Sequence, residues 1–111
     1  MSMQMGNYRF RTFKARPSLY KHGLNYDKQG AIYFTCKLYF TILTEDEQLR
    51  FKTLCWECAK QKQNVYSGLF EYLTSELNMD EVCEIYGIGR SNFYRYVDEF
   101  YINFGYVKKV F

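Results

Sequence analysis

The stretch MDEVCEIYGIGRSNFYRYVD, residues 79–98, decides the expected fold of this 111-residue chain. Asn78 and Glu81 have the spacing of a capping box, in which each side chain bonds the other residue's backbone N–H at a helix start. Gly87 suits the left-handed residue that ends a short helix, and a helical pattern resumes at Arg90. A short helix, a turn that contains glycine and a second helix are typical of a helix-turn-helix unit.

The apolar residues of this stretch fit the interior of such a unit. Val82 and Cys83 lie on one side of the first helix, and the small Cys83 suits a close crossing of the two helices. Ile88 fills the turn, and Phe93 with Tyr96 supplies two anchors three positions apart on the second helix. We therefore expect these five side chains to hold the unit together.

The polar residues of the second helix predict a face for double-stranded DNA. Arginine makes bidentate contacts to guanine, asparagine reads adenine, and serine and tyrosine bind phosphates. The first turn of a helix also favours phosphate through its free N–H groups. The predicted contacts are Arg90, Ser91, Asn92, Tyr94 and Arg95. The alternative interpretation is an ordinary corner between two helices of an all-α core.

Further helices are expected on both sides of this unit. Thr44 and Glu47 form another capping box, and the helix that they open has an apolar stripe at helical spacing, made of Phe51, Leu54, Cys55 and Cys58. A second helix is expected over 65–77, with Asn64 as its cap, and the last helix is expected to end at Gly105. The region 44–111 is thus predicted to be one helical DNA-binding domain.

Charge sets the first 43 residues apart from the rest. Residues 1–43 carry seven Lys and Arg against one acid, whereas residues 44–111 carry eight basic and eleven acidic side chains. A basic arm beside a near-neutral body favours an anionic partner, above all nucleic acid. We expect phosphate or minor-groove contacts from Arg9, Arg11, Lys14 and Arg16.

The same extension is rich in aromatic residues. Residues 1–30 show no lasting helical period, and residues 31–43, AIYFTCKLYFTIL, combine β-branched and aromatic side chains as a strand does. A buried helical segment is the alternative, because periodicity alone does not separate the two. The predicted fold class is mainly α, with a helix-turn-helix and an aromatic N-terminal extension that contains β structure. Residues 31–43 are also the expected contact between copies in a homo-oligomer.

Other chemistries have weaker signals. Cys55 and Cys58 form a C-x-x-C pair that would make a zinc site with Cys36, Cys83 and His22, but no second close pair exists, so core packing is expected. The chain shows no catalytic triad and no nucleotide-binding glycine motif, so neither an enzyme nor a cofactor is expected. It also shows no membrane-length apolar run and no secretory signal, which favours a cytoplasmic location.

From about Ile42 to Asn103 the chain resembles the PapB-type adhesin-biosynthesis regulators, which control fimbrial operons of enteric bacteria. The resemblance rests on Tyr72-Leu73 at the end of an apolar helix, the polar loop 74–80, and the run EVCEIY at 81–86. It implies a small oligomeric DNA-binding protein that regulates transcription. Two alternatives stay open: a protein-interaction adaptor or inhibitor, and an RNA or single-strand binder that uses the aromatic arm.

Overall fold

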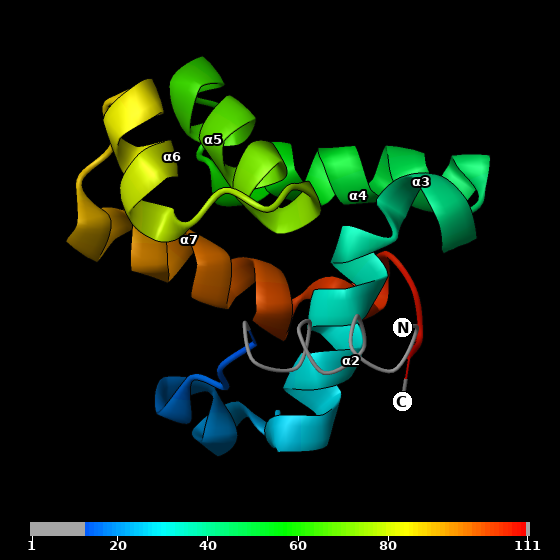
Figure 1. The fold of residues 1–111 in the computed structure, drawn as a ribbon. Helices are drawn as coiled ribbons and strands as arrows, with labels where there is room; N and C mark the ends of the chain where they lie inside the picture. Colours follow the sequence, from blue (N-terminus) through cyan, green and yellow to red (C-terminus); the bar gives the residue numbers. More distant parts are fainter. Residues whose placement is uncertain (1–12, 111) are drawn as a thin grey trace, which may run out of the picture.

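A computed structural model describes residues 13–110 of the chain. These residues fold into helices, and no strand occurs among them (Figure 1). The α-helices and the two short 3-10 helices are, in chain order, η1 (Pro17–His22), α2 (Tyr26–Lys37), α3 (Tyr39–Ile42), α4 (Glu45–Cys58), α5 (Gln63–Thr74), α6 (Met79–Tyr86), α7 (Arg90–Ile102) and η2 (Phe104–Tyr106). The expectation of a mainly α protein is confirmed.

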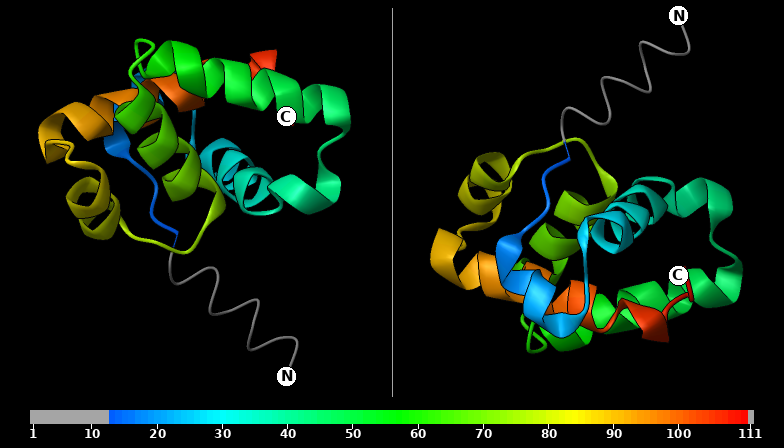
Figure 2. Two further views of the ribbon diagram at one scale, coloured as in Figure 1. Left: turned by 90° about the horizontal axis from the view of Figure 1, so that it is seen from above. Right: turned by 90° about the horizontal axis from the view of Figure 1, so that it is seen from below.

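Helix α5 lies at the centre of the arrangement. It packs against α2, α4, α6 and α7, and α4 also packs against α7. Figure 1 shows α5 and α6 above α7, with α2 beside them. In both views of Figure 2 the segment 13–16 passes between α2 on one side and α6 with α7 on the other, before η1 reaches α7. The N-terminal segment therefore joins two parts of the helical body.

The strand predicted over residues 31–43 is wrong, because this region forms α2 and α3. The Asn25 side chain accepts a hydrogen bond from the Lys28 backbone N–H at 2.9 Å and starts α2 within the part expected to be irregular. Gln29, Ile32 and Cys36 are buried at helical spacing along one face. Burial of that face outweighs the preference of β-branched and aromatic residues for strands.

One aromatic cluster joins the N-terminal helices to the rest of the core. The Phe51 ring lies 4.8 Å from Tyr39, 5.8 Å from Phe70 and 4.9 Å from Phe100, measured between ring centroids. Edge-to-face ring pairs of this kind add to the gain from burial itself. Other residues of the N-terminal part that are buried in the same core are Leu19, Leu24, Ile32 and Cys36.

The predicted helix starts at Thr44 and Asn78 are confirmed. The Thr44 hydroxyl accepts from the Glu47 N–H at 3.1 Å, and the Glu47 carboxylate accepts from the Thr44 N–H at 2.9 Å. Asn78 and Glu81 exchange the same two bonds, each at 2.9 Å. Gly87 ends α6 with a φ of 67°, a left-handed value that glycine adopts without strain.

Three other helix ends differ from expectation. Helix α5 begins after Lys62, so Asn64 lies inside it and its amide donates to the Tyr86 carbonyl at 3.1 Å instead of capping the helix. The same helix ends at Thr74, before the predicted end at residue 77. Helix α7 ends at Ile102, and Gly105 lies within η2. Contacts with neighbouring elements set these ends in place of the local signals.

Gly68 permits a close approach between α5 and α6. A Cβ atom at this position would lie 2.8 Å from Ile88 Cδ1 and 3.3 Å from both Tyr86 Cδ2 and Val82 Cγ1. Gly68 is thus the point where α5 meets α6 and the turn that follows it. The small residue expected at a helix crossing, Cys83, is buried nearby but is not this contact.

We predict that Gly68→Leu destabilises the protein by about 1–3 kcal/mol, because the added side chain overpacks the contact with Ile88 and Val82. Urea denaturation followed by circular dichroism measures the free energy of unfolding. Gly105→Leu is the control, since a Cβ there meets nothing within 4 Å, and its effect is expected to stay within about 0.5 kcal/mol. Equal effects of the two substitutions would contradict the assignment.

A second prediction concerns Glu47. Its bond from the Thr44 backbone N–H and its contact with Lys108 lower the pKa of the carboxyl group. This contribution to stability is present above the unfolded-state pKa of about 4.3 and is lost as the pH falls through the lower folded-state pKa. Glu47→Gln should lower the melting temperature at neutral pH, and its difference from wild type should vanish in acid. Glu45→Gln, in the same turn, should give a smaller difference at neutral pH.

Candidate nucleic-acid interface

The turn between α6 and α7 fixes the start of the candidate interface. Gly87 ends α6 in a left-handed conformation, and the Ile88 N–H donates to the Cys83 carbonyl at 3.0 Å. The Ile88 side chain is buried, as expected for the residue that fills the turn. Gly89 then precedes α7 and supplies no side-chain cap, and the first turn of α7 contains no acid. The first N–H groups of α7 are thus without a side-chain acceptor from their own helix end.

The two sides of α7 differ sharply. Phe93, Val97 and Phe100 are buried at helical spacing. Four of the five predicted contact residues of α7 are exposed: Arg90 in the first turn, and Ser91, Asn92 and Arg95 away from the buried side, while the fifth, Tyr94, is half-buried. The structure therefore brings the four exposed residues together on the first half of one helix.

Both arginines of this face are held by neighbours. Arg90 Nη1 lies 2.5 Å from Asp80 Oδ1, and Arg90 Nη2 donates to the Tyr94 hydroxyl at 3.1 Å. The bond with Tyr94 and the charge of Asp80 raise the pKa of Arg90. Arg95 donates to the Asn92 side-chain oxygen. These contacts orient the guanidinium groups along the helix.

Acidic residues lie beside the positive residues of α7. The neighbouring helix α6 exposes Asp80, Glu81 and Glu84. These acids repel a negatively charged partner, whereas Arg90 and Arg95 on the adjoining part of α7 attract one. The sequence pattern marks the outward residues of α7 but does not show that the acids of α6 lie beside them, because the two helices come together only in the fold.

The predicted arm residues have different places. Arg9 and Arg11 lie outside the described residues, and Lys14 is exposed. Arg16 forms a two-pronged ion pair with Asp98 of α7, with Nε–Oδ1 at 2.5 Å and Nη2–Oδ2 at 3.0 Å. Its guanidinium also lies 4.3 Å from the centroid of the Tyr94 ring. Arg16 thus fastens the N-terminal segment to α7, which leaves its charge neutralised.

Lys37 is a residue whose role the sequence did not reveal. Its ammonium group donates to the Tyr72 carbonyl at 3.2 Å and to the Ser75 carbonyl, at the end of α5. Burial lowers the pKa of Lys37. A cation at the negative end of a helix satisfies carbonyl groups that have no partner within the helix. Lys37 therefore ties α2 to α5 and does not serve the candidate interface.

The four cysteines are free thiols in the interior. Burial raises the pKa of each, that of Cys58 to about 12. Cys55 and Cys58 lie in the core on the predicted apolar stripe of α4, so the expectation of core packing is confirmed. Within residues 13–110, no group of three His, Cys, Asp or Glu side chains is placed to hold a metal ion.

The comparisons add no relative. No protein-family model, no curated protein and no solved structure matches this chain. The likeness to PapB-type regulators therefore stays a prediction from the sequence alone. Among the helices of the described residues, none has the length and apolar character needed to cross a membrane.

We predict that Arg16 and Asp98 are energetically coupled. Their side chains are only 31% and 21% exposed, and the pair makes two parallel bonds. A double-mutant cycle with Arg16→Gln and Asp98→Asn, measured by urea denaturation, should give a coupling energy of about 1 kcal/mol. The control cycle uses Lys60 and Glu99, a 3.5 Å pair that is 61% and 49% exposed, and should give a smaller coupling. A negligible value for the first cycle would show that Arg16 does not fasten α7.

Proposed function

We propose that this protein binds double-stranded DNA through the first half of α7 and regulates transcription. In this proposal α6, the turn at 87–89 and α7 act as a helix-turn-helix, and α7 enters the major groove. The observation that carries the proposal is the exposed group Arg90, Ser91, Asn92 and Arg95 on a helix start that has neither an acid nor a side-chain cap.

The contrast with α4 and α6 supports this assignment, while α5 resembles α7 in having neither a side-chain cap nor an acid in its first turn but carries no arginine there. The N-terminal ends of α4 and α6 are closed by capping boxes and carry acids in their first turns. The first turn of α7 instead begins with Arg90 and leaves backbone N–H groups available to a phosphate. A helix end of this kind attracts anions through both its dipole and its side chains.

The packing of α7 against its neighbours supports the proposal as well. Phe93 and Val97 anchor α7 in the core. Arg16 of the N-terminal segment lies against the Tyr94 ring and pairs with Asp98. A recognition helix that is rigid before binding loses little conformational freedom when it meets a groove. Tyr94 therefore acts in our proposal as a support for Arg90 and not as a direct DNA contact.

Asp80 has a defined part in the proposal. It pairs with Arg90 in the free protein at 2.5 Å, and a DNA phosphate would take its place. The exchange makes Asp80 a competitor of DNA for the same guanidinium. Its removal should strengthen duplex binding, whereas a surface that serves another class of partner has no reason to respond in this way.

A homo-oligomer is the second part of the proposal, because one small domain reads few base pairs. Of the segment 31–43 predicted to join copies, Phe40 is 77% exposed and Ile42 is 43% exposed, and Leu49 of α4 is 64% exposed. Such exposed apolar side chains are typical of contact surfaces. The same three residues favour the alternative function, a protein-interaction adaptor that binds an unrelated protein.

The test is duplex DNA binding by fluorescence anisotropy across a salt series. We expect wild type to bind with a steep salt dependence. Arg90→Ala with Arg95→Ala should weaken binding and reduce the slope of log affinity against log salt by about 0.9 for each phosphate that the variant no longer neutralises. Lys52→Ala with Lys109→Ala, which removes two exposed cations outside α7, is the charge-matched control and should retain the slope.

The last variant in the binding test is Asp80→Asn, which should bind duplex DNA more tightly than wild type. Equally weakened binding in the α7 pair and in the control pair would overturn the recognition-helix assignment. Tighter binding of single-stranded DNA or RNA than of duplex would favour the aromatic-arm alternative. Absence of duplex binding at low salt would favour the protein-interaction alternative.

A further inference from the structure

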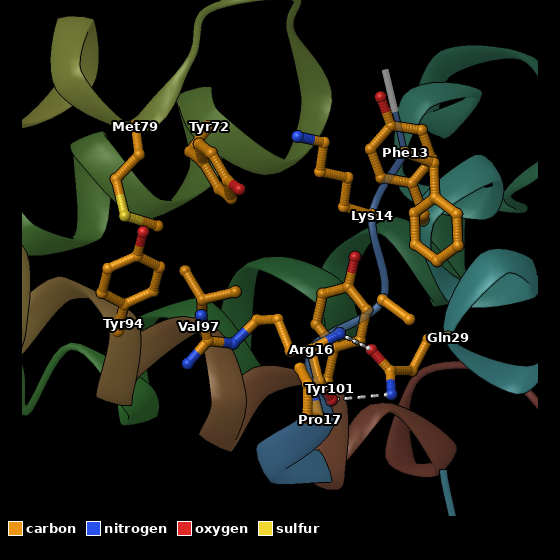
Figure 3. A pocket seen from close by; sticks show the side chains of 12 residues that line it. Phe13, Lys14, Arg16, Pro17, Gln29, Tyr72, Met79, Tyr94, Val97 and Tyr101 are labelled. Atoms are coloured by element: carbon orange, nitrogen blue, oxygen red, sulfur yellow. Dashed lines mark hydrogen bonds between the residues drawn. The ribbon is translucent and has the colours of Figure 1, made fainter. Parts of the chain in front are cut away.

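A depression lies between the N-terminal segment and the helices that it crosses. One part has a volume of about 390 Å³ and is shown in Figure 3. A neighbouring part of about 370 Å³ continues it toward the end of α5. Both parts are lined by Lys14, Tyr33, Tyr72, Met79 and Tyr101. These volumes lie in the range of about 300–1,000 Å³ that small-molecule sites occupy.

Tyr101 supplies a hydrogen-bonding group to the depression. The residue is only 9% exposed, and its ring rises from α7 with the hydroxyl directed into the depression (Figure 3). No residue in the range 13–110 forms a hydrogen bond with this hydroxyl, and because no buried side-chain polar atom of these residues lacks a partner, its oxygen is open to the depression and free to bond a ligand there. Burial also raises the pKa of Tyr101, so the hydroxyl remains a donor at neutral pH.

Lys14 supplies a positive charge to the depression. Its side chain extends across the depression toward Tyr72 (Figure 3), and no carboxylate of the described residues pairs with its ammonium group. The other two cations at this place are engaged, because Arg16 pairs with Asp98 and Lys37 bonds the Tyr72 and Ser75 carbonyls. Lys14 is therefore the cation that remains for an incoming anion.

The aromatic residues that line the depression indicate the shape of the ligand. The rings of Tyr33, Tyr72, Tyr94 and Tyr101 line the first part of the depression together with Phe13. Tyrosine and phenylalanine rings favour flat, aromatic partners, which they contact by stacking or edge to face. A flat ring that carries one negative group and one hydrogen-bonding group matches this combination of aromatic walls, Lys14 and the Tyr101 hydroxyl.

We propose that this depression binds a small aromatic carboxylate, with the carboxylate at Lys14, the ring between the tyrosines and a polar substituent at the Tyr101 hydroxyl. The site joins the segment 13–17 to α7, so a bound ligand would strengthen the hold of that segment on the helix. Tyr94 lines the depression and also accepts a hydrogen bond from Arg90, so the site borders the proposed DNA face, but its occupation is measured without DNA.

The test is isothermal titration calorimetry with 4-hydroxybenzoate as the probe, and 4-hydroxybenzamide and acetate as comparison compounds. Wild type should bind one molecule of 4-hydroxybenzoate per chain, and both comparison compounds should bind more weakly. Lys14→Ala should weaken binding about tenfold or more, because it removes a hydrogen bond between two charged groups. Tyr101→Phe keeps the ring and should weaken binding about threefold to tenfold.

Lys21→Ala and Tyr20→Phe are the matched controls, since both residues lie in η1 and neither lines the depression. They should retain the wild-type dissociation constant within about twofold. Absence of saturable binding, equal binding by the Lys14 variant, or an equal decrease in Lys21→Ala would overturn the proposal. Circular dichroism checks the fold of each variant, and Lys14→Gln, at an exposed position, decides the outcome if Tyr101→Phe is unfolded.

Discussion

The close contact at Gly68 is the constraint on which the rest of the structure depends. Because this position of α5 has no side chain, Val82, Tyr86 and Ile88 approach the helix axis directly. The contact fixes α6 and its following turn on the central helix, and the turn in turn sets the direction of α7. The exposed arginines of α7 and the aromatic depression beside it both depend on that direction.

Local signals in the sequence predicted the helices of residues 44–102, apart from some of their ends. Both capping boxes, the left-handed Gly87 and the stripe of α4 involve residues at most seven positions apart, so they are visible in the chain itself. The prediction over residues 31–43 failed because residue type favoured a strand, while burial at helical spacing, visible only in the fold, favoured α2.

The candidate sites depend on contacts that the sequence does not show. The four exposed residues of α7 were predictable from a helical period, but the acids of α6 beside them were not placed by any pattern. Nothing near Arg16 marks a partner 82 positions away, and nothing near Lys37 marks the end of α5. Two cations of the basic extension therefore have structural roles, and the net charge of that region overstates what it offers to an anion.

The pair between Arg16 and Asp98 also bears on the order in which the chain is made. A ribosome releases the N-terminal segment first and α7 among the last elements, so residues 13–22 emerge long before the helix against which they pack. Until that moment their apolar and charged side chains have no native partner in α7. Closure of this contact consequently waits until α7 has emerged and carries the loop-closure cost of a long sequence separation.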